Sequence, residues 1–224
     1  RLALEAIPGP EASKALRDAL ATTSGALKAG VIGSIAVRRD LEAVPALAAL
    51  LGDADPVVAE AAAAALARLA TPEAADALKQ ALARTDLSPV TRAVFCDGLL
   101  GCADALAADG KTDAALALYD QLLDAADTPR TARCAALRGG ALARGGDDAV
   151  PRLAAAMKGE DRHLFEAALR AAREISGGAK VTKALAALLP EIPAERKAAF
   201  IQLLGERGDG AGPALLAEAK TAPV

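Results

Sequence analysis

The sequence predicts an all-α protein built from stacked pairs of helices, and three observations predict it. Ala and Leu, two of the strongest helix formers, supply 62 and 33 of the 224 residues. Aromatic residues, which favour strands, make up only 2% of the chain. A Leu-x-x-x-Leu pattern also recurs along the whole length, as it does in helical repeats. Together these observations exclude a β-sandwich or barrel.

The recurring pairs set the period of the repeat. Their first members are separated by 31, 31, 40, 35, 32 and 30 residues. Two residues four apart lie on one helical face, so each pair gives its helix an apolar stripe. One helix pair cannot bury such a stripe alone, and neighbouring pairs must therefore stack. The pairs are Leu16/Leu20, Leu47/Leu51, Leu78/Leu82, Leu118/Leu122, Leu153/Met157, Leu185/Leu189 and Leu215/Ala219.

Proline, glycine and capping residues predict where each helix begins and ends. Proline tolerates the first helical turn, and Asp, Ser or Thr just before it caps the free N–H groups. Asp55, Thr71, Ser88 and Thr128 are the expected N-caps. Glycines such as Gly52, Gly110 and Gly208 fall between helices, where C-caps and turns are needed.

These signals predict the elements in order. A lone helix comes first at 11–22, and we expect its partner to lie outside the segment. Six helix pairs follow: 26–38 with 42–51, 56–70 with 73–84, 89–108 with 111–126, 130–144 with 148–158, 161–176 with 180–189, and 194–207 with 212–220. Because the first helix lacks a partner and the last pair ends the chain abruptly, we expect the natural protein to be longer.

Residues 41–82 carry a recognisable motif. Ala43 to Leu47 give AVPAL, a helix break follows at Asp53 or Asp55, and Val58 to Leu66 (VAEAAAAAL) approximate V-x-x-A-A-x-A-L. This pattern resembles HEAT repeats, particularly the phycobilisome-lyase HEAT-like subclass. The resemblance is strong over 26–84, fair over 129–220 and weak at 85–128. The weak part, near 103–128, instead resembles a tetratricopeptide-type hairpin.

The HEAT resemblance implies a specific architecture. It is a right-handed α-α superhelix of the armadillo type, with about six helix pairs plus one N-terminal helix. We expect a single array over 1–224, with repeats near 24–52, 55–84, 88–127, 129–158, 161–190 and 193–220.

Residues that could perform catalysis are few. His163 is the only histidine, which excludes a multi-His metal site. Cys96, Cys102 and Cys134 form no C-x-x-C motif, and we expect small buried thiols. No serine lies in a G-x-S-x-G motif. We therefore predict a protein that is not an enzyme and holds no cofactor or metal.

Three glycine pairs interrupt expected helices: Gly30/Gly33, Gly98/Gly101 and Gly139/Gly140. No strand precedes them and no Lys-Ser/Thr follows, so they are not phosphate-binding loops. Close packing of one helix on another explains them, and a locally opened ligand cleft is the alternative.

Charge restricts the class of partner. The net charge is −3 and the isoelectric point is near 5.3, so no basic footprint for nucleic acid is present. Glu60 and Arg68 interrupt the longest Ala-rich stretch, and we expect no membrane span in this segment. The expected partner is a protein or another domain of the same chain. The compartment stays open: cytoplasmic if no signal peptide has been removed, and envelope or secreted otherwise.

The HEAT resemblance also suggests an interaction surface, because in HEAT proteins the second helices line a concave groove. The residues just after the first Leu of each pair would then face the groove. The most featured of them are Arg17, Asp18, Lys79, Gln80, Tyr119 and Asp120. Tyr119 has an alternative role, filling the irregular junction at the long repeat.

The predicted function is a non-catalytic scaffold that binds another protein or domain by this concave face. The alternative is a bilin lyase-type or other ligand-handling HEAT-like protein.

Overall fold

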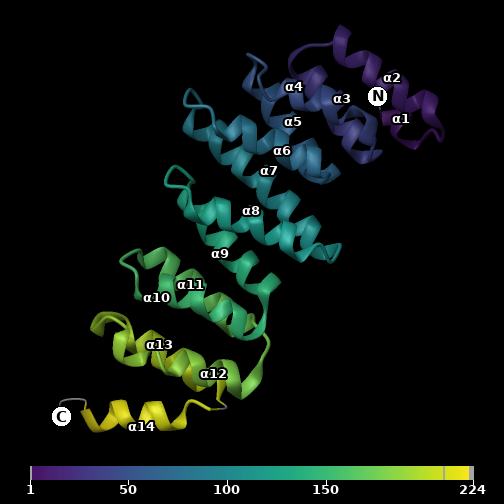
Figure 1. Ribbon diagram of the computed structural model, residues 1–224. Coiled ribbons are helices and arrows are strands. Elements are labelled where there is room, and N and C mark those ends of the chain that lie inside the picture. Colours follow the sequence, from purple (N-terminus) through teal and green to yellow (C-terminus); the bar gives the residue numbers. More distant parts are fainter. Residues whose placement is uncertain (1, 209, 222–224) are drawn as a thin grey trace. The chain divides into compact units, whose positions relative to one another are not determined.

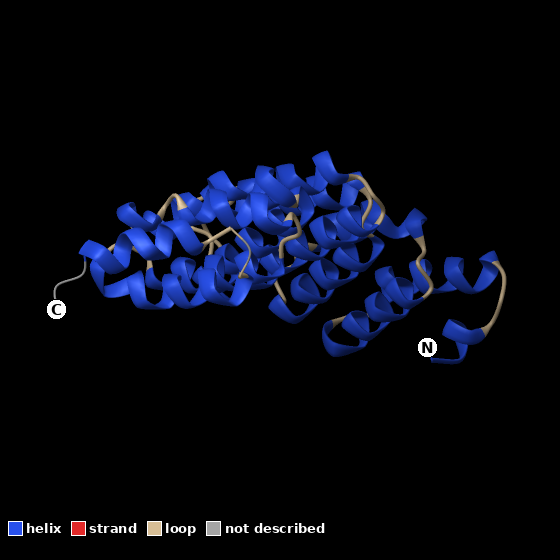
Figure 2. Ribbon diagram, turned by 90° about the horizontal axis from the view of Figure 1, so that it is seen from below, coloured by secondary structure: helices blue, strands red, loops and turns tan. Residues whose placement is uncertain are grey.

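The computed structural model describes residues 2–208 and 210–221, and all regular structure in these ranges is helical (Figures 1 and 2). The prediction of an all-α fold is confirmed. The α-helices are α1 Leu2–Ala6, α2 Pro10–Thr22, α3 Gly25–Val37, α4 Val44–Leu50, α5 Pro56–Leu69, α6 Pro72–Leu82, α7 Pro89–Ala108, α8 Thr112–Asp124, α9 Arg130–Arg144, α10 Val150–Lys158, α11 Arg162–Glu174, α12 Gly178–Ala186, α13 Ala194–Arg207 and α14 Gly212–Thr221.

Three of the four predicted N-caps are made by the expected side chains, and the fourth, Thr128, stays a prediction. Asp55 accepts a hydrogen bond from the backbone N–H of Val57 at 3.0 Å, at the start of α5. Thr71 and Ser88 cap α6 and α7 in the same way, and all three helices begin with proline. Local chemistry therefore sets these boundaries.

The expected lone helix at 11–22 is α2, and the prediction that it stands alone is wrong. The short helix α1 precedes it and contacts both α2 and α3. Arg38 holds α1 in place by donating hydrogen bonds to the carbonyl oxygens of Leu4 at 2.7 Å and Ile7 at 2.6 Å. The sequence did not reveal α1 because five residues are too few to show a helical period.

Three expected second helices are shorter than predicted and are completed by a 3-10 turn. These turns are η1 Leu41–Ala43 before α4, η2 Gly146–Ala149 before α10, and η3 Leu189–Glu191 after α12. A proline lies at the junction in each case: Pro45, Pro151 and Pro190. Since proline lacks an N–H donor, it interrupts the α-helical hydrogen-bond ladder at that point.

The chain divides into two compact units. Unit 1 comprises 1–118 and 126–132, and unit 2 comprises 119–125 and 133–224, so the division passes through α8 and α9. Each unit has its own packing. The single array over 1–224, its handedness and the tetratricopeptide-like hairpin stay predictions.

Unit 1 shows the stacking that the repeat predicts (Figure 1). Successive first helices contact each other, α1 with α3, α3 with α5, and α5 with α7. Each second helix also contacts the next first helix, as α4 does with α5 and α6 with α7. The first leucines of the pairs, Leu16, Leu47 and Leu78, are buried at the centre of this packing. In contrast, Leu82 is only half-buried.

Glycines in α7 allow α5 to approach closely. A Cβ on Gly98 would lie 3.3 Å from the carbonyl oxygen of Ala63, and one on Gly101 would lie 3.1 Å from the Cβ of Ala67. The close-packing prediction is therefore confirmed for this pair. It is wrong for Gly33, where an added Cβ would meet nothing within 4 Å.

Unit 2 repeats the same scheme. Here α10 contacts α11 and α12, and α13 contacts α11 and α12. A continuous apolar core joins these helices to α9. Its fully buried members include Leu137, Leu153, Leu185, Phe200 and Leu203.

Candidate interaction surface

The six predicted groove residues lie on three second helices. Arg17 and Asp18 belong to α2, and Lys79 and Gln80 belong to α6, all in unit 1. Tyr119 and Asp120 belong to α8, in the part of it that falls in unit 2. The four residues of unit 1 and the two of unit 2 are therefore separate sets.

Arg17 forms ion pairs within unit 1. Its guanidinium lies 2.5 Å from the Asp40 carboxylate and 2.8 Å from that of Glu42. The Asp40 side chain is 6% exposed and that of Arg17 is 24% exposed. The pair ties α2 to the turn that follows α3, so Arg17 helps to stack one repeat on the next.

Asp18, Lys79 and Gln80 lie toward solvent. Asp18 and Gln80 are exposed, and the side chain of Lys79 is 35% exposed. Asp18 pairs with Lys14 at 2.6 Å and Lys79 pairs with Asp76 at 2.5 Å, each within one helix. Exposed pairs of this kind contribute little to stability and exchange readily, so these charges are available to a partner.

Tyr119 is buried, with 2% of its surface exposed. Its ring lies against Gly139 and Gly140 of α9, where a Cβ on Gly140 would be 3.3 Å from the Cβ of Tyr119. The groove assignment of Tyr119 is therefore wrong, and its other predicted role, filling the space at this junction, is the one observed. The two adjacent glycines were the sequence signal, because they leave room for a ring.

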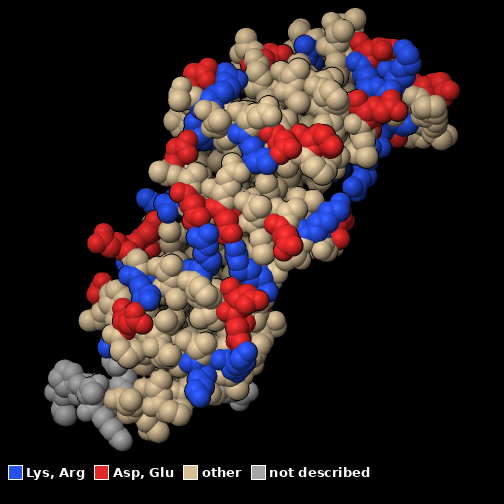
Figure 3. All heavy atoms as spheres, in the orientation of Figure 1, with Lys and Arg blue, Asp and Glu red and all other residues tan. Residues whose placement is uncertain are grey.

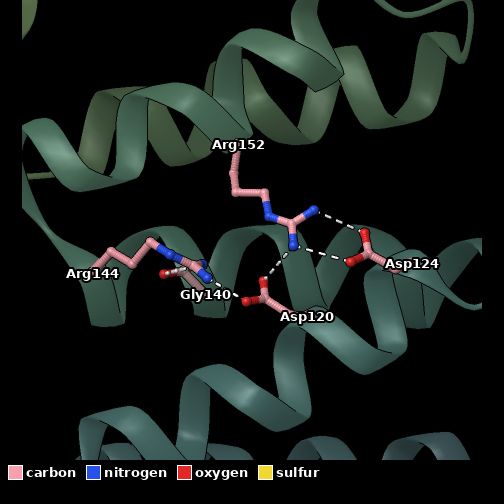
Figure 4. Close-up of polar contacts among 5 residues, drawn as sticks. All are labelled: Asp120, Asp124, Gly140, Arg144 and Arg152. Carbon is pink, nitrogen blue, oxygen red and sulfur yellow. Dashed lines mark hydrogen bonds and ion pairs between the residues drawn. The ribbon is translucent and has the colours of Figure 1, made fainter.

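Asp120 lies at the centre of an ion-pair network (Figure 4). Arg144 approaches its carboxylate to 2.5 Å from the end of α9, and Arg152 approaches to 3.4 Å from α10. Arg152 also donates two hydrogen bonds to Asp124, at 2.8 and 3.0 Å. These bonds raise the pKa of Arg152. Asp120 therefore joins α8 to α9 and α10.

Three members of this network, Asp124, Arg144 and Arg152, are not among the residues predicted from the sequence. Asp120 and Asp124 are four residues apart and so share a helical face, which was the available signal. Their arginine partners come from two later helices, and no local pattern indicates such a contact.

An open pocket of about 310 Å³ lies beside this network in unit 2. Its lining combines apolar residues with charges of both signs. The apolar residues are Leu123, Leu137, Ala155, Ala156 and Leu164, the charged ones are Asp124, Arg133, Arg152, Glu160 and Asp161, and Gly159 completes the lining. Such a pocket can hold an apolar side chain of a partner, while polar groups beside that side chain contact the charged lining residues.

The histidine and the two buried cysteines lie outside the ion-pair network and are not among the residues that line the pocket. His163 is exposed in the first turn of α11. Cys96 and Cys102 are buried, as predicted, and burial raises the pKa of each thiol to about 11. Over 2–208 and 210–221, no three His, Cys, Asp or Glu side chains gather as metal ligands would. In the same ranges, no helix has both the length and the apolar character needed to cross a bilayer.

Charged side chains of both signs alternate over the face shown in Figure 3. Blue and red side chains lie next to each other in small clusters, and uncharged surface separates one cluster from the next.

Comparison with known proteins supports the repeat assignment. Residues 13–99 match the family model for HEAT repeats. Among solved structures, the chain is similar to an engineered protein determined by the Northeast Structural Genomics Consortium. The two are 21% identical with a TM-score of 0.43, over 91% of this chain and 90% of that one. No curated protein gave a significant match. The finer assignment to the phycobilisome-lyase subclass stays a prediction. Residues 13–99 are thus similar to HEAT repeats, and the paired, stacked helices of unit 1 agree with this similarity.

Proposed function

We propose that the chain is a non-catalytic scaffold that binds another protein, or another domain of its own chain, through the exposed face of its second helices. The observation that carries the proposal is the exposure of Asp18, Lys79 and Gln80 on α2 and α6, inside the segment that matches HEAT repeats. HEAT repeats commonly serve in protein binding. A fold alone does not determine function, so the exposed residues carry the argument.

The second helix of the repeat between these two, α4, supports the same use. α4, which contacts α6, exposes the small uncharged residues Pro45, Ala46 and Ala49. A partner can approach such a surface closely, because short side chains do not obstruct its backbone. The charges on α6 beside it would then fix the orientation of the partner, since charge complementarity contributes mostly to specificity.

Unit 2 offers a different feature for the same function. Asp120 is already paired with Arg144 and Arg152, so the 310 Å³ pocket next to it is the better contact point. Its apolar lining residues suit a side chain such as leucine, and burial of such an anchor is typical of interface hot spots. Glu160 in the lining is exposed and could pair with a cation of the partner.

The test is affinity capture from the source cells with the parent chain and with the variant Asp18→Lys/Lys79→Glu. The variant should lose specific partners that the parent retains, because it reverses two exposed charges while keeping the core. Lys111→Glu is the matched control, since Lys111 is 58% exposed and belongs to the α7–α8 turn and to neither of these helices. Retention of the same proteins by the parent and the double variant would remove the proposal.

A second measurement distinguishes the proposed scaffold from the alternative function, the handling of a tetrapyrrole. The parent chain is incubated with a bilin, passed over a desalting column and scanned for absorbance. We expect no bilin to stay bound, and a stoichiometric bilin spectrum would favour the alternative.

A further inference from the structure

Three large apolar side chains are exposed at the N-terminal ends of α3, α5 and α7. Leu27 is 61% exposed, Val57 51% and Val90 65%, and each is the second or third residue of its helix. These three residues are called the apolar row below. All three belong to unit 1, and their helices contact one another in the order α3, α5, α7.

The helices α5 and α7 run parallel and in register. Gly98 of α7 lies against Ala63 of α5, and three residues later Gly101 lies against Ala67. Residues about 34 positions apart therefore face each other along this pair. Val57 and Val90, which are 33 positions apart, thus lie at equivalent heights at the same end of the two helices.

The helices α3 and α5 are in register as well. A Cβ on Gly25 would lie 3.7 Å from the carboxylate of Asp55, so the first residue of α3 adjoins the N-cap of α5. The offset is 30 residues, the same as between Leu27 and Val57. Since packed helices lie about 8–10 Å apart, the apolar row extends over roughly 20 Å along one edge of unit 1.

Folding of unit 1 does not require apolar residues at these positions. Asp55 and Ser88 already cap the starts of α5 and α7 through their side chains. Valine is a poor helix former, so helix propensity does not favour it there either. Exposed apolar side chains that recur in register are instead typical of a binding surface.

The charges next to the apolar row are mainly acidic. Glu60 lies one turn beyond Val57 on α5, and exposed Asp97 lies two turns beyond Val90 on α7. Neither carboxylate forms an ion pair with any described residue. The nearby cations are already engaged, because Lys28 lies 3.8 Å from Asp53 and Arg92 lies 2.5 Å from Asp127. The surface is consequently apolar with uncompensated negative charge.

We propose that the apolar row binds a cationic amphipathic helix of a partner protein. A helix rises about 1.5 Å per residue, so apolar residues at i, i+7 and i+14 are about 10.5 Å apart and match the spacing of the row. Lysine or arginine residues between them would lie near Glu60 and Asp97. This surface belongs to the first helices, and the inference therefore goes beyond the proposed use of the second helices.

The test uses two synthetic helical peptides of equal length and the full chain. Both carry leucine at every seventh position, one with lysines and the other with glutamates on the flanks. Fluorescence anisotropy at physiological salt should show at least about tenfold tighter binding of the lysine peptide. The variant Leu27→Ser/Val57→Ser/Val90→Ser should weaken this binding by about tenfold or more. Val37→Ser and Leu216→Ser, at exposed apolar residues elsewhere, should leave it unchanged.

A second variant tests the charges. Glu60→Gln/Asp97→Asn should reduce the preference for the lysine peptide, whereas the control Asp113→Asn should keep it. Equal binding of both peptides by the parent, or full binding by the triple variant, would overturn the proposal. Sedimentation supplies a further outcome: self-association of the parent that the triple variant loses would assign the surface to a second copy of the chain, and would also overturn it.

Discussion

The ring of Tyr119 in α8 lies directly against Gly139 in α9. A Cβ at Gly139 would be 2.6 Å from Cζ of the ring and 3.0 Å from its hydroxyl oxygen. The ring is almost fully buried, so it cannot move aside into solvent. The ring of Tyr119 therefore fills the space that the missing side chain of Gly139 leaves.

Gly139→Ala should destabilise the protein, because the new methyl group occupies the space of a buried ring. The expected cost is about 1–3 kcal/mol in the free energy of unfolding, measured by urea denaturation. In the background Tyr119→Ala the same change should cost much less. The control Gly33→Ala, in a helix with open space at that position, should be neutral or stabilising by up to about 1 kcal/mol. Equal effects at Gly139 and Gly33 would contradict the packing described here.

Asp120→Ala should destabilise unit 2 more than Asp124→Ala. The first change leaves Arg144, whose side chain is 17% exposed, without its carboxylate, at a cost of about 1–3 kcal/mol. Asp124 is 57% exposed, so its pair with Arg152 should contribute less than about 1 kcal/mol. Urea denaturation of both variants measures the difference. The reverse order of stability would show that Asp124 is the more important partner.

Leu78→Ala should cost about 2–5 kcal/mol, because Leu78 is fully buried between α6 and α7. Ala63→Leu should cost about 1–3 kcal/mol by overpacking the close contact of α5 with α7. Leu82→Ala is the matched comparison and should cost less than Leu78→Ala, since Leu82 is half-buried. Thermal scans that place all three variants at the parent's midpoint would disprove the stacking model.

Cysteine reactivity should differ along the chain. Burial raises the pKa of Cys96 and Cys102 to about 11, so at pH 8 only about one thiol in a thousand is ionised and reactive. Cys134 is only partly buried and should react first with a thiol reagent such as DTNB. In urea all three should react at similar rates. Fast reaction of two or three thiols in the native protein would show that the core opens readily.

Stability should depend on the charge state of Glu174. Hydrogen bonds from Arg138 lower the pKa of this carboxyl below its ordinary value of 4.5. A lowered folded-state pKa stabilises the protein above pH 4.5, and this stabilisation is lost as the pH falls through the folded-state pKa. Glu174→Gln should therefore lower the urea midpoint slightly at pH 7 but not near pH 3. Glu195→Gln, at an exposed carboxylate without an ion pair in the described residues, is the matched control and should leave the midpoint at pH 7 unchanged.

Part of the candidate surface was predictable and part was not. The periodic leucines located α2, α6 and α8 and placed Asp18, Lys79 and Gln80 toward solvent. The same alignment placed Arg17 and Asp120 in a groove, whereas each pairs with a residue more than twenty positions away. Helical periodicity tells which face a residue occupies, but it does not tell whether another helix covers that face.

The sequence by itself determined the helical fold, the period of the pairs and most helix boundaries, because these depend on contacts within a few residues. Asp55, Thr71 and Ser88 cap helices through neighbours two or three positions away. Only the tertiary structure decided that Tyr119 is buried, that Asp120 joins three helices and that Leu27, Val57 and Val90 form one row. Each of these depends on the register between helices some 20 to 60 residues apart, and that register follows from packing, not from local propensity.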